Sequence, residues 1–174
     1  MNSSNPKEES WITTLNRRYA ASEPLFGPDQ VAEMIPHRDP FLVIDDIVEF
    51  DRDRARIVGR KKITDSEDVL RGHFPGAPIF PGVLIIEALA QTGGVLIHQM
   101  GYKGKIPVII RLEKTTFRRP VFPEAVLFTV CESIHLKERG GRMRTYAVVG
   151  ERACAFAEIG FALVDASELR TRQV

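Results

Sequence analysis

The chain has 174 residues, of which 44% are hydrophobic and 27% charged, and its formal net charge is +1. This length predicts one domain, because a domain of about 150 residues already buries roughly 70% of the surface of its unfolded chain. The balance of charge argues against a general attraction to nucleic acid or to an anionic membrane. Cys131 and Cys154 are too few for a disulfide scaffold and are typical of buried thiols in a reducing compartment.

Residues 1–29 are predicted to form an N-terminal extension. The start, MNSSNPKEES, lacks the charged and then apolar order of a signal peptide, so we expect a cytoplasmic protein. Residues 11–20 are expected to form a short helix with three side chains on one face: Trp11, Leu15 and Tyr19. Such an apolar face would dock on the body of the protein or on a neighbouring subunit, the alternative being a frayed tail. A second short helix is predicted over residues 28–35.

Six segments rich in Val, Ile and Phe are predicted to be strands: residues 41–50, 55–63, 108–117, 125–136, 142–150 and 153–164. The first two suggest a hairpin, and the short connections among the last four predict antiparallel pairing. Residues 83–100 have the length of a helix and are apolar nearly all round, which predicts a buried helix. This segment is too short and too interrupted for a membrane span. The expected fold class is therefore α+β, with a curved antiparallel sheet wrapped around one helix.

Two glycines within the predicted helix, Gly93 and Gly94, are expected to permit close approach to another backbone. Just before the helix, residues 72–82 contain three glycines and three prolines, a density that argues against regular structure and fixes the path of the backbone. His73 lies near the start of this loop, and Glu87 follows in the first turns of the helix.

Each of these two residues has an ordinary interpretation, because a loop histidine is usually solvated and a glutamate favours a helix N-terminus. Together they resemble an acid–base pair beside an anion-stabilising helix end. The four histidines have no metal-ligand spacing, so no metal site is expected. Basic clusters at Arg60–Lys62 and around Arg118 are interpreted as solvated strand faces.

The segment GHFPGAPIFPGVLIIEALAQ (72–91) resembles the signature of the 3-hydroxyacyl-acyl carrier protein dehydratases. The segments IPHRDPFLVIDDI (35–47) and FRRPVFP (117–123) resemble two further motifs of that family. The resemblance covers residues 30–165 and leaves residues 166–174 as a tail. It implies a hot-dog fold and a homodimer as the minimal unit, with a hexamer of three dimers as a further expectation. Glu87, where the related isomerase-dehydratase branch carries Asp, favours the dehydratase-only branch.

The resemblance also implies roles for single residues. His73 matches the catalytic histidine and Glu87 the catalytic carboxylate, which reach one site from opposite subunits. Gly82 matches the glycine whose N–H polarises the thioester carbonyl, and Val83 lies beside it as a second substrate contact. Arg118 and Arg119 are expected to meet the acidic acyl carrier protein and the phosphate of its phosphopantetheine. No metal or redox cofactor is expected.

Three features set this chain apart. Pro123-Glu124-Ala125 replaces the Pro-Gly-Asp turn of the family, which predicts a different backbone path. The stretch Pro107–Arg111 replaces an aromatic gate and predicts a narrowed or redirected acyl tunnel. His37 is expected to order the start of the first strand rather than to act in chemistry.

The predicted function is dehydration of 3-hydroxyacyl-carrier protein to trans-2-enoyl-carrier protein in fatty acid synthesis. One alternative is a dehydratase for polyketide, polyene or other specialised acyl chains. A second alternative is a non-catalytic hot-dog subunit that binds acyl chains or supports a partner enzyme. A thioesterase is less expected, because such enzymes generally lack an intact HFPG-type loop.

Overall fold

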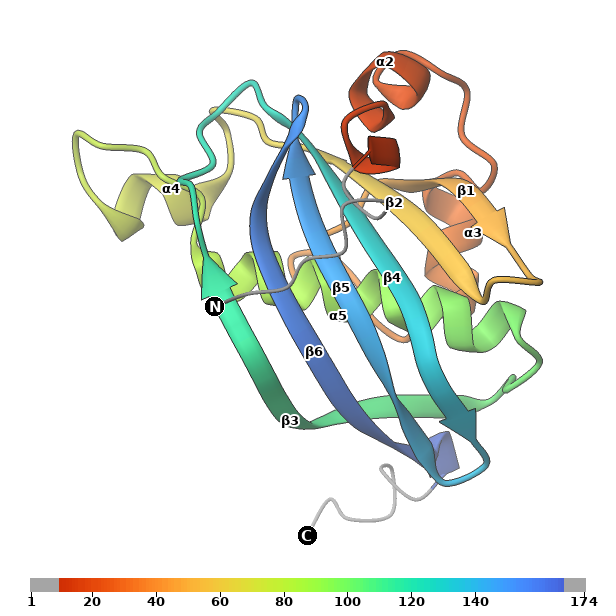
Figure 1. The fold of residues 1–174 in the computed structure, drawn as a ribbon. Coiled ribbons are helices and arrows are strands. Elements are labelled where there is room, and N and C mark those ends of the chain that lie inside the picture. Colours follow the sequence, from red (N-terminus) through yellow and green to blue (C-terminus); the bar gives the residue numbers. More distant parts are fainter. Residues whose placement is uncertain (1–9, 168–174) are drawn as a thin grey trace, which may run out of the picture.

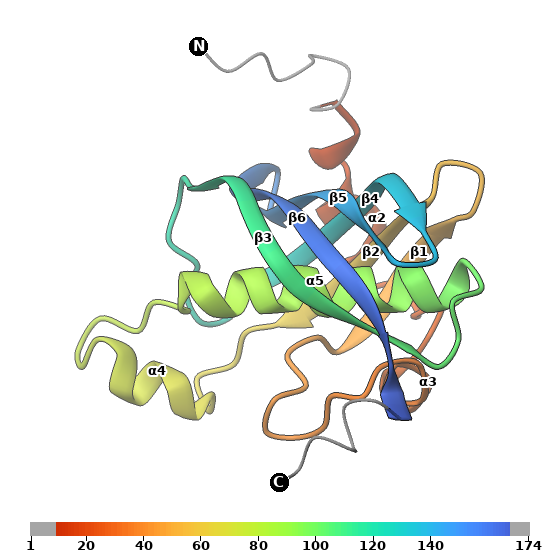
Figure 2. The same cartoon turned by 90° about the horizontal axis from the view of Figure 1, so that it is seen from below.

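The computed structural model describes residues 10–167. A six-stranded antiparallel sheet curves around one long helix, α5 (Gly82–Gln99), with strand order β1-β2-β4-β5-β6-β3 (Figure 1). The strands are β1 (Asp46–Asp51), β2 (Arg56–Lys62), β3 (Lys105–Phe117), β4 (Val126–Lys137), β5 (Gly140–Val149) and β6 (Arg152–Asp165). Figure 2 shows α5 lying along the concave side of the sheet. The predicted α+β architecture is confirmed.

The other helices are short: α2 (Leu15–Tyr19), α3 (Pro28–Met34) and α4 (Asp68–His73). α3 matches the helix predicted over residues 28–35, and the strands match their predictions except that the first begins at Asp46 rather than at residue 41. α4 was not predicted. It has only six residues, and it ends inside the segment whose glycines and prolines argue against regular structure.

The core lies between α5 and the concave face of the sheet. Six apolar side chains of α5 are each at most 2% exposed: Ile85, Ala88, Leu89, Val95, Leu96 and Ile97. They belong to one apolar cluster with side chains of β2, β4, β5 and β6. Burying one such Leu or Ile side chain contributes about 1.5–3 kcal/mol to stability. The helix is buried because it has no polar face to turn to water, as the sequence predicts.

The two glycines of α5 face tightly packed neighbours. A Cβ atom on Gly93 would lie 2.3 Å from Sδ of Met143 on β5, and one on Gly94 would lie 3.1 Å from Cγ2 of Ile35. Such distances leave no room for an alanine without movement of the neighbour. The expected close approach is present, and its partners are side chains rather than another backbone.

The N-terminal arm, residues 10–22, packs on the outer face of the sheet. Ile12 and Leu15 are 4% and 0% exposed, and they form a second apolar cluster with Val58, Phe128 and Val130 of β2 and β4. The arm therefore contacts the body of its own chain. The predicted helix is interrupted, since residues 10–12 and α2 are helical with a turn between them. Residues 1–9 and 168–174 lie outside the described part of the chain.

A buried arginine fastens the end of this arm. Arg60 Nη1 donates to the carbonyl oxygens of Tyr19 (2.6 Å) and Ser22 (3.0 Å), while its Nε and Nη2 donate to the carboxylate of Asp46 (2.9 and 2.7 Å). Arg60 is 5% exposed and Lys61 7%. The prediction of a solvated face is therefore wrong for these two residues. It fails because the arm and the acidic partners cover side chains that a strand pattern alone leaves in water.

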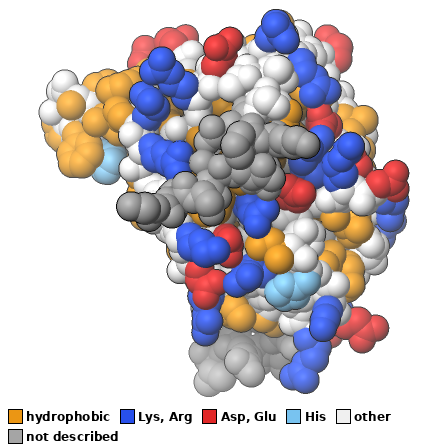
Figure 3. Space-filling view, viewed as in Figure 1, with side chains coloured by type: hydrophobic (Ala, Val, Ile, Leu, Met, Phe, Trp, Pro, Cys, Tyr) orange, Lys and Arg blue, Asp and Glu red, His pale blue; other side chains and the backbone are white. Residues whose placement is uncertain are grey.

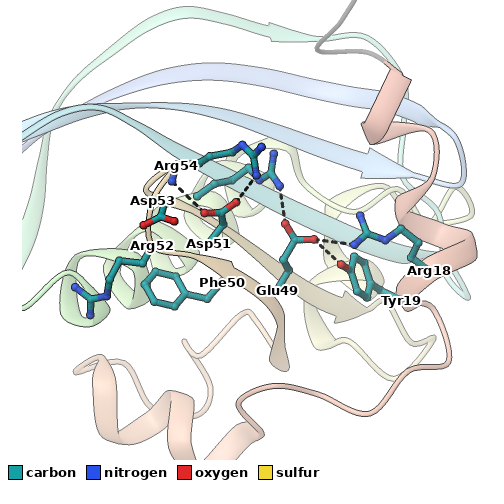
Figure 4. Close-up of a pocket in the computed structure, with 9 residues that line it drawn as sticks. Arg18, Tyr19, Glu49, Phe50, Asp51, Arg52, Asp53 and Arg54 are labelled. Carbon is teal, nitrogen blue, oxygen red and sulfur yellow. Dashed lines mark hydrogen bonds and ion pairs between the residues drawn. The ribbon is translucent and has the colours of Figure 1, made fainter.

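Figure 4 shows a hollow between the arm and the β1–β2 turn. Glu49 lies at its centre, accepts hydrogen bonds from the Tyr19 hydroxyl and from Arg56 Nη2 (2.7 Å), and forms an ion pair with Arg18 (3.4 Å). Burial, and then the hydrogen bond to Glu49, raise the pKa of Tyr19 to about 12, so its hydroxyl remains a donor. None of the predicted site residues lines this hollow, which serves to anchor the arm.

The turn Pro123-Glu124-Ala125 has a backbone conformation that favours glycine at its second residue. Ala125 N–H donates to the carbonyl oxygen of Phe122 (3.4 Å), and Glu124 N–H donates to that of Ile63 (2.8 Å). Glu124 has φ 63°, in the left-handed region that favours glycine. The predicted difference in backbone path stays a prediction, and Glu124 occupies a conformation that a glycine would take at lower energy.

Replacing Glu124 by glycine should stabilise the protein. Relief of left-handed strain outweighs the larger entropy of an unfolded glycine, so we expect Glu124→Gly to raise the free energy of unfolding by about 0.5–1 kcal/mol. A urea titration would show a higher midpoint with an unchanged slope. Glu138→Gly is the matched control, because Glu138 is exposed in a turn and has no positive φ, and it should lower the stability. A destabilised Glu124→Gly would show that this conformation carries no strain.

β3 forms one free edge of the sheet, where it pairs only with β6. Its outer part exposes Val108 (39%), Ile110 (68%) and Leu112 (46%). An edge strand with exposed apolar side chains is suited to pairing with another chain. Val108 and Ile110 belong to the stretch Pro107–Arg111, which is expected to replace an aromatic gate. Within one chain they face solvent, so an effect on an acyl tunnel would need a second subunit.

Candidate active site

His73 is the last residue of α4, and its ring is fixed by one hydrogen bond. Nδ1 lies 2.8 Å from the carbonyl oxygen of Ile79. A carbonyl oxygen can only accept, so Nδ1 carries a proton and the neutral ring has its free lone pair on Nε2. The ring also packs against Phe74, with 4.0 Å between the centroids. The loop thus fixes the orientation of the His73 ring and leaves the lone pair of Nε2 free.

The loop after His73 has a defined backbone path, as its composition predicts. Ala77 N–H donates to the carbonyl oxygen of Phe74 (2.8 Å), which closes a turn over Pro75 and Gly76. Proline at the second position and a glycine with φ 82° at the third are what a type II turn requires. At the far end Phe80 is 2% exposed, and its N–H donates to a carbonyl of the segment after β3 (2.8 Å).

α5 begins at Gly82 with an open N-terminus. Pro81 precedes it and provides no side-chain cap, so the N–H groups of Gly82 and Val83 have no intrahelical acceptor. The N–H groups of the next two residues donate to the Pro81 carbonyl oxygen. A Cβ on Gly82 would lie 2.9 Å from Cε1 of Phe117, so the ring of Phe117 requires a glycine there. The result is an accessible, partially positive helix end beside the His73 loop.

Glu87 lies one turn further along α5 and is partly buried. Its Oε1 accepts a hydrogen bond from Gln91 Nε2 (2.8 Å) and lies 3.4 Å from Nε2 of His37. Burial lowers the pKa of His37, although the nearby Glu87 carboxylate opposes this shift. His37 therefore faces the predicted catalytic carboxylate rather than the backbone of the first strand.

Gln91, rather than His37, orders the segment that leads into the first strand. Its Oε1 accepts from Val43 N–H (2.9 Å), and its Nε2 donates to the carbonyl oxygen of Phe41 (2.8 Å). Sequence reasoning missed Gln91 and His37 as neighbours of Glu87. A signal existed for Gln91, a polar residue in an apolar helix four positions after Glu87, where side chains meet on one face. No pattern indicated His37.

His73 and Glu87 do not pair within one chain. Among residues 10–167, no hydrogen bond or ion pair joins them. α4 projects beyond the first turn of α5 and away from the sheet (Figures 1 and 2). Hydrophobic side chains gather on this projection at the upper left of Figure 3. Phe74, the residue after α4, is 50% exposed. Within one chain, the two predicted catalytic side chains are therefore not joined.

Comparison with known proteins identifies the family. A model of the FabA-like domain matches residues 35–155. The chain belongs to the FabA-like family. It is 43% identical to a 3-hydroxyacyl-[acyl-carrier-protein] dehydratase FabZ of Protochlamydia amoebophila over 81% of this chain and 92% of the relative. It is 40% identical to the FabZ of Chlamydia trachomatis serovar L2 over 82% and 95% of the two chains, and 43% identical to that of Symbiobacterium thermophilum over 78% and 95%.

Solved structures confirm the hot-dog fold of this FabA-like chain. The dehydratase heterocomplex ApeI:P from Xenorhabdus doucetiae is similar with a TM-score of 0.69 at 13% identity, covering 81% of this chain and 95% of that one. A hypothetical thioesterase with coenzyme A from Streptococcus pneumoniae has a TM-score of 0.55 at 15% identity, covering 69% and 85%. At these identities the likeness shows the fold alone.

Arg118 and Arg119 begin directly after Phe117, whose ring lies against the N-terminus of α5. Their backbone N–H groups donate to the Cys154 carbonyl oxygen (2.7 and 3.3 Å), and both residues are exposed. Two positive side chains thus stand in water near the open helix end. Lys and Arg side chains also cover much of the outer sheet face in Figure 3, interspersed with Asp and Glu.

The two cysteines of the FabA-like chain lie among apolar side chains. Cys131 and Cys154 are free and buried, and burial raises the pKa of Cys154 to about 11, as expected for unreactive thiols. In the described range no three His, Cys, Asp or Glu side chains come together as a metal site needs. Over the same residues, no helix combines the length and hydropathy needed to span a membrane.

Proposed function

We propose that this protein removes water from 3-hydroxyacyl chains carried on acyl carrier protein and forms trans-2-enoyl chains, in fatty acid biosynthesis. The observation that carries the proposal is 40–43% identity to curated FabZ dehydratases over more than 90% of their length. The site geometry supports the same reaction, because a loop histidine with a free Nε2, an open helix end and a carboxyl group are its three chemical requirements.

In this proposal His73 is the base. Its Nε2 takes the proton from C2 of the acyl chain, and the electron pair of that C–H bond forms the C2=C3 double bond. Negative charge develops meanwhile on the thioester oxygen. The N–H of Gly82 has no intrahelical acceptor at the start of α5 and would stabilise this charge without reorganisation, with Val83 beside it. Neutral imidazole is a suitable base near pH 7.

Glu87 is the acid. Hydroxide is a poor leaving group, so Glu87 donates its proton to the C3 hydroxyl, which leaves as water when the C3–O bond breaks. After the reaction His73 holds the C2 proton and Glu87 is a carboxylate, and proton exchange with solvent resets the pair. A positioned acid or base contributes about 10²–10⁴-fold to such a rate. This chemistry proceeds without a metal or redox cofactor.

The functional unit in this proposal is a homodimer in which His73 and Glu87 of one site come from different subunits. Two observations support it. The free edge of β3 exposes apolar side chains that a second β3 would cover, and α4 carries His73 away from its own Glu87. The assembly of three dimers stays a prediction, as does the cytoplasmic location. Arg118 and Arg119 are proposed to bind the acidic carrier protein and the phosphate of its arm.

The first experiment is turnover by the purified protein alone, given 3-hydroxyacyl-carrier protein substrates of several lengths. We expect enoyl product with straight chains, detected by mass spectrometry, and no loss of rate in the presence of a chelator. Absence of product with every chain would overturn the proposal. Product only after addition of a partner enzyme would indicate a supporting subunit, and product only with branched or polyene chains would indicate a specialised pathway.

A further inference from the structure

Two side-chain nitrogen atoms lie near the same oxygen of Glu87. One is Gln91 Nε2, 2.8 Å from Glu87 Oε1. The orientation of the Gln91 amide is settled by its other contacts, because Val43 N–H can only donate and must face Gln91 Oε1. Nε2 therefore carries the two hydrogens that reach the Phe41 carbonyl oxygen and Glu87 Oε1. Gln91 is 1% exposed, so this arrangement is fixed in the core.

The second group is His37. Its Nε2 lies 3.4 Å from Glu87 Oε1, whereas its Nδ1 is buried and has no hydrogen-bond partner within residues 10–167. The neighbouring Arg38 is directed elsewhere, because its Nη1 donates to the carbonyl oxygens of Ile35 (2.8 Å) and His37 (2.6 Å). Glu87 is thus the acidic group that the His37 ring faces, and Nε2 is the ring atom that faces it.

We propose that His37 is a positioning residue for Glu87: together with Gln91 it holds Oε1 as the acceptor oxygen, so that the acidic proton is carried by Oε2. This inference rests on the proposed function, in which Glu87 protonates the leaving hydroxyl. In a protonated carboxyl group the carbonyl oxygen is the better acceptor. The N–H that Gln91 donates to Oε1, with His37 Nε2 3.4 Å from the same oxygen, favours the form with the hydroxyl at Oε2. The proton is then on the oxygen left free for the substrate.

The kinetic signature follows from this geometry. Glu87 meets only the reacting hydroxyl, so a misplaced proton slows the chemical step and leaves the binding of the acyl chain and carrier unchanged. We expect His37→Leu to lower kcat about 10–100-fold, the scale of a small misplacement in an active site, with KM changed less than about twofold. A merely structural role of the ring would alter stability or KM instead.

Two conservative variants sharpen the test. Glutamine can place an N–H close to the position of histidine Nε2, whereas asparagine is too short to reach Glu87. His37→Gln should therefore restore kcat to within about fivefold of the native value, and His37→Asn should resemble His37→Leu. His135→Leu is the matched control, because His135 is exposed on β4 and should keep native kinetics. If His37→Leu fails to fold, the comparison of Gln with Asn still decides.

Native kcat in His37→Leu or His37→Asn, or a His37→Gln variant no better than these, would overturn the inference. A second readout separates its failure from failure of the function. Relative to the native protein, the ¹⁵N resonance of His37 Nε2 should shift in Glu87→Gln and stay unchanged in Glu138→Gln. This expectation holds whether or not the enzyme turns over. An unmoved resonance refutes the His37–Glu87 contact itself, while a moved resonance with no native dehydration refutes the proposed function and with it the acid role.

Discussion

An equal mixture of His73→Ala and Glu87→Gln chains should recover activity that neither variant shows alone. Each substitution removes one partner of the proposed acid–base pair, and we expect each purified variant to lose about 10²–10⁴-fold in kcat. The loss should be this large because no described side chain near either residue replaces its proton transfer. His37 carries its free nitrogen away from solvent, and Gln91 has no exchangeable acid proton.

Recovery follows from the symmetry of the dimer. Random exchange of subunits makes about half of the dimers mixed. Each mixed dimer has two sites, of which one holds both native residues. The mixture should therefore reach about a quarter of native activity. The measurement is enoyl formation before and after exchange in mild urea. The control mixes His73→Ala with a chain that carries both substitutions, which cannot form an intact site. Failure to recover after proven exchange would place His73 and Glu87 in sites within one chain.

Ile110→Lys should convert the dimer into monomers and abolish activity. Ile110 is 68% exposed on the free edge of the sheet, the most exposed side chain in the apolar stretch of β3. Burying a lysine against a second β3 would desolvate its charge without a partner. A monomer brings no second Glu87 to His73, so we expect turnover to fall by more than about 100-fold through loss of the paired site.

Sedimentation velocity and turnover on the same samples test this expectation. Ile134→Lys provides the comparison, because Ile134 is 38% exposed on β4, away from the free edge, and should remain dimeric and active. A fully active Ile110→Lys dimer would show that the subunits meet at another surface.

Much of this architecture is readable from the sequence. The helix α5 is predicted because its apolar residues cover every face, and the strands because β-branched and aromatic residues alternate with short turns. The glycine and proline density before α5 correctly indicates a fixed loop. Sequence periodicity does not explain why residue 82 is a glycine. The ring of Phe117, which is distant in sequence, fills the space that a side chain at residue 82 would occupy.

Other features depend on contacts between distant segments. Arg60 looks like a surface residue until the N-terminal arm brings three carbonyl groups to it. The backbone strain at Glu124 cannot be read from the sequence, because it is seen only in the positive φ angle of that residue. His37 is fifty residues from Glu87 in the chain, and its contact arises because the segment before β1 crosses α5 at that carboxylate. Local sequence patterns predict helices and strands. The roles of such residues depend on tertiary structure, which those patterns do not describe.

In the proposed mechanism, the hydrogen bond between His73 and Ile79 makes the order of the loop a condition for the reactivity of His73. An imidazole free in water exchanges between two tautomers, and only the one protonated at Nδ1 leaves Nε2 as a base. The carbonyl of Ile79 selects that tautomer only while the turn at Pro75–Gly76 is formed. A substitution that loosened the turn would therefore reduce the reactive fraction of His73 without touching the ring. Selection for activity would then act on the glycines and prolines of the loop as strongly as on the histidine.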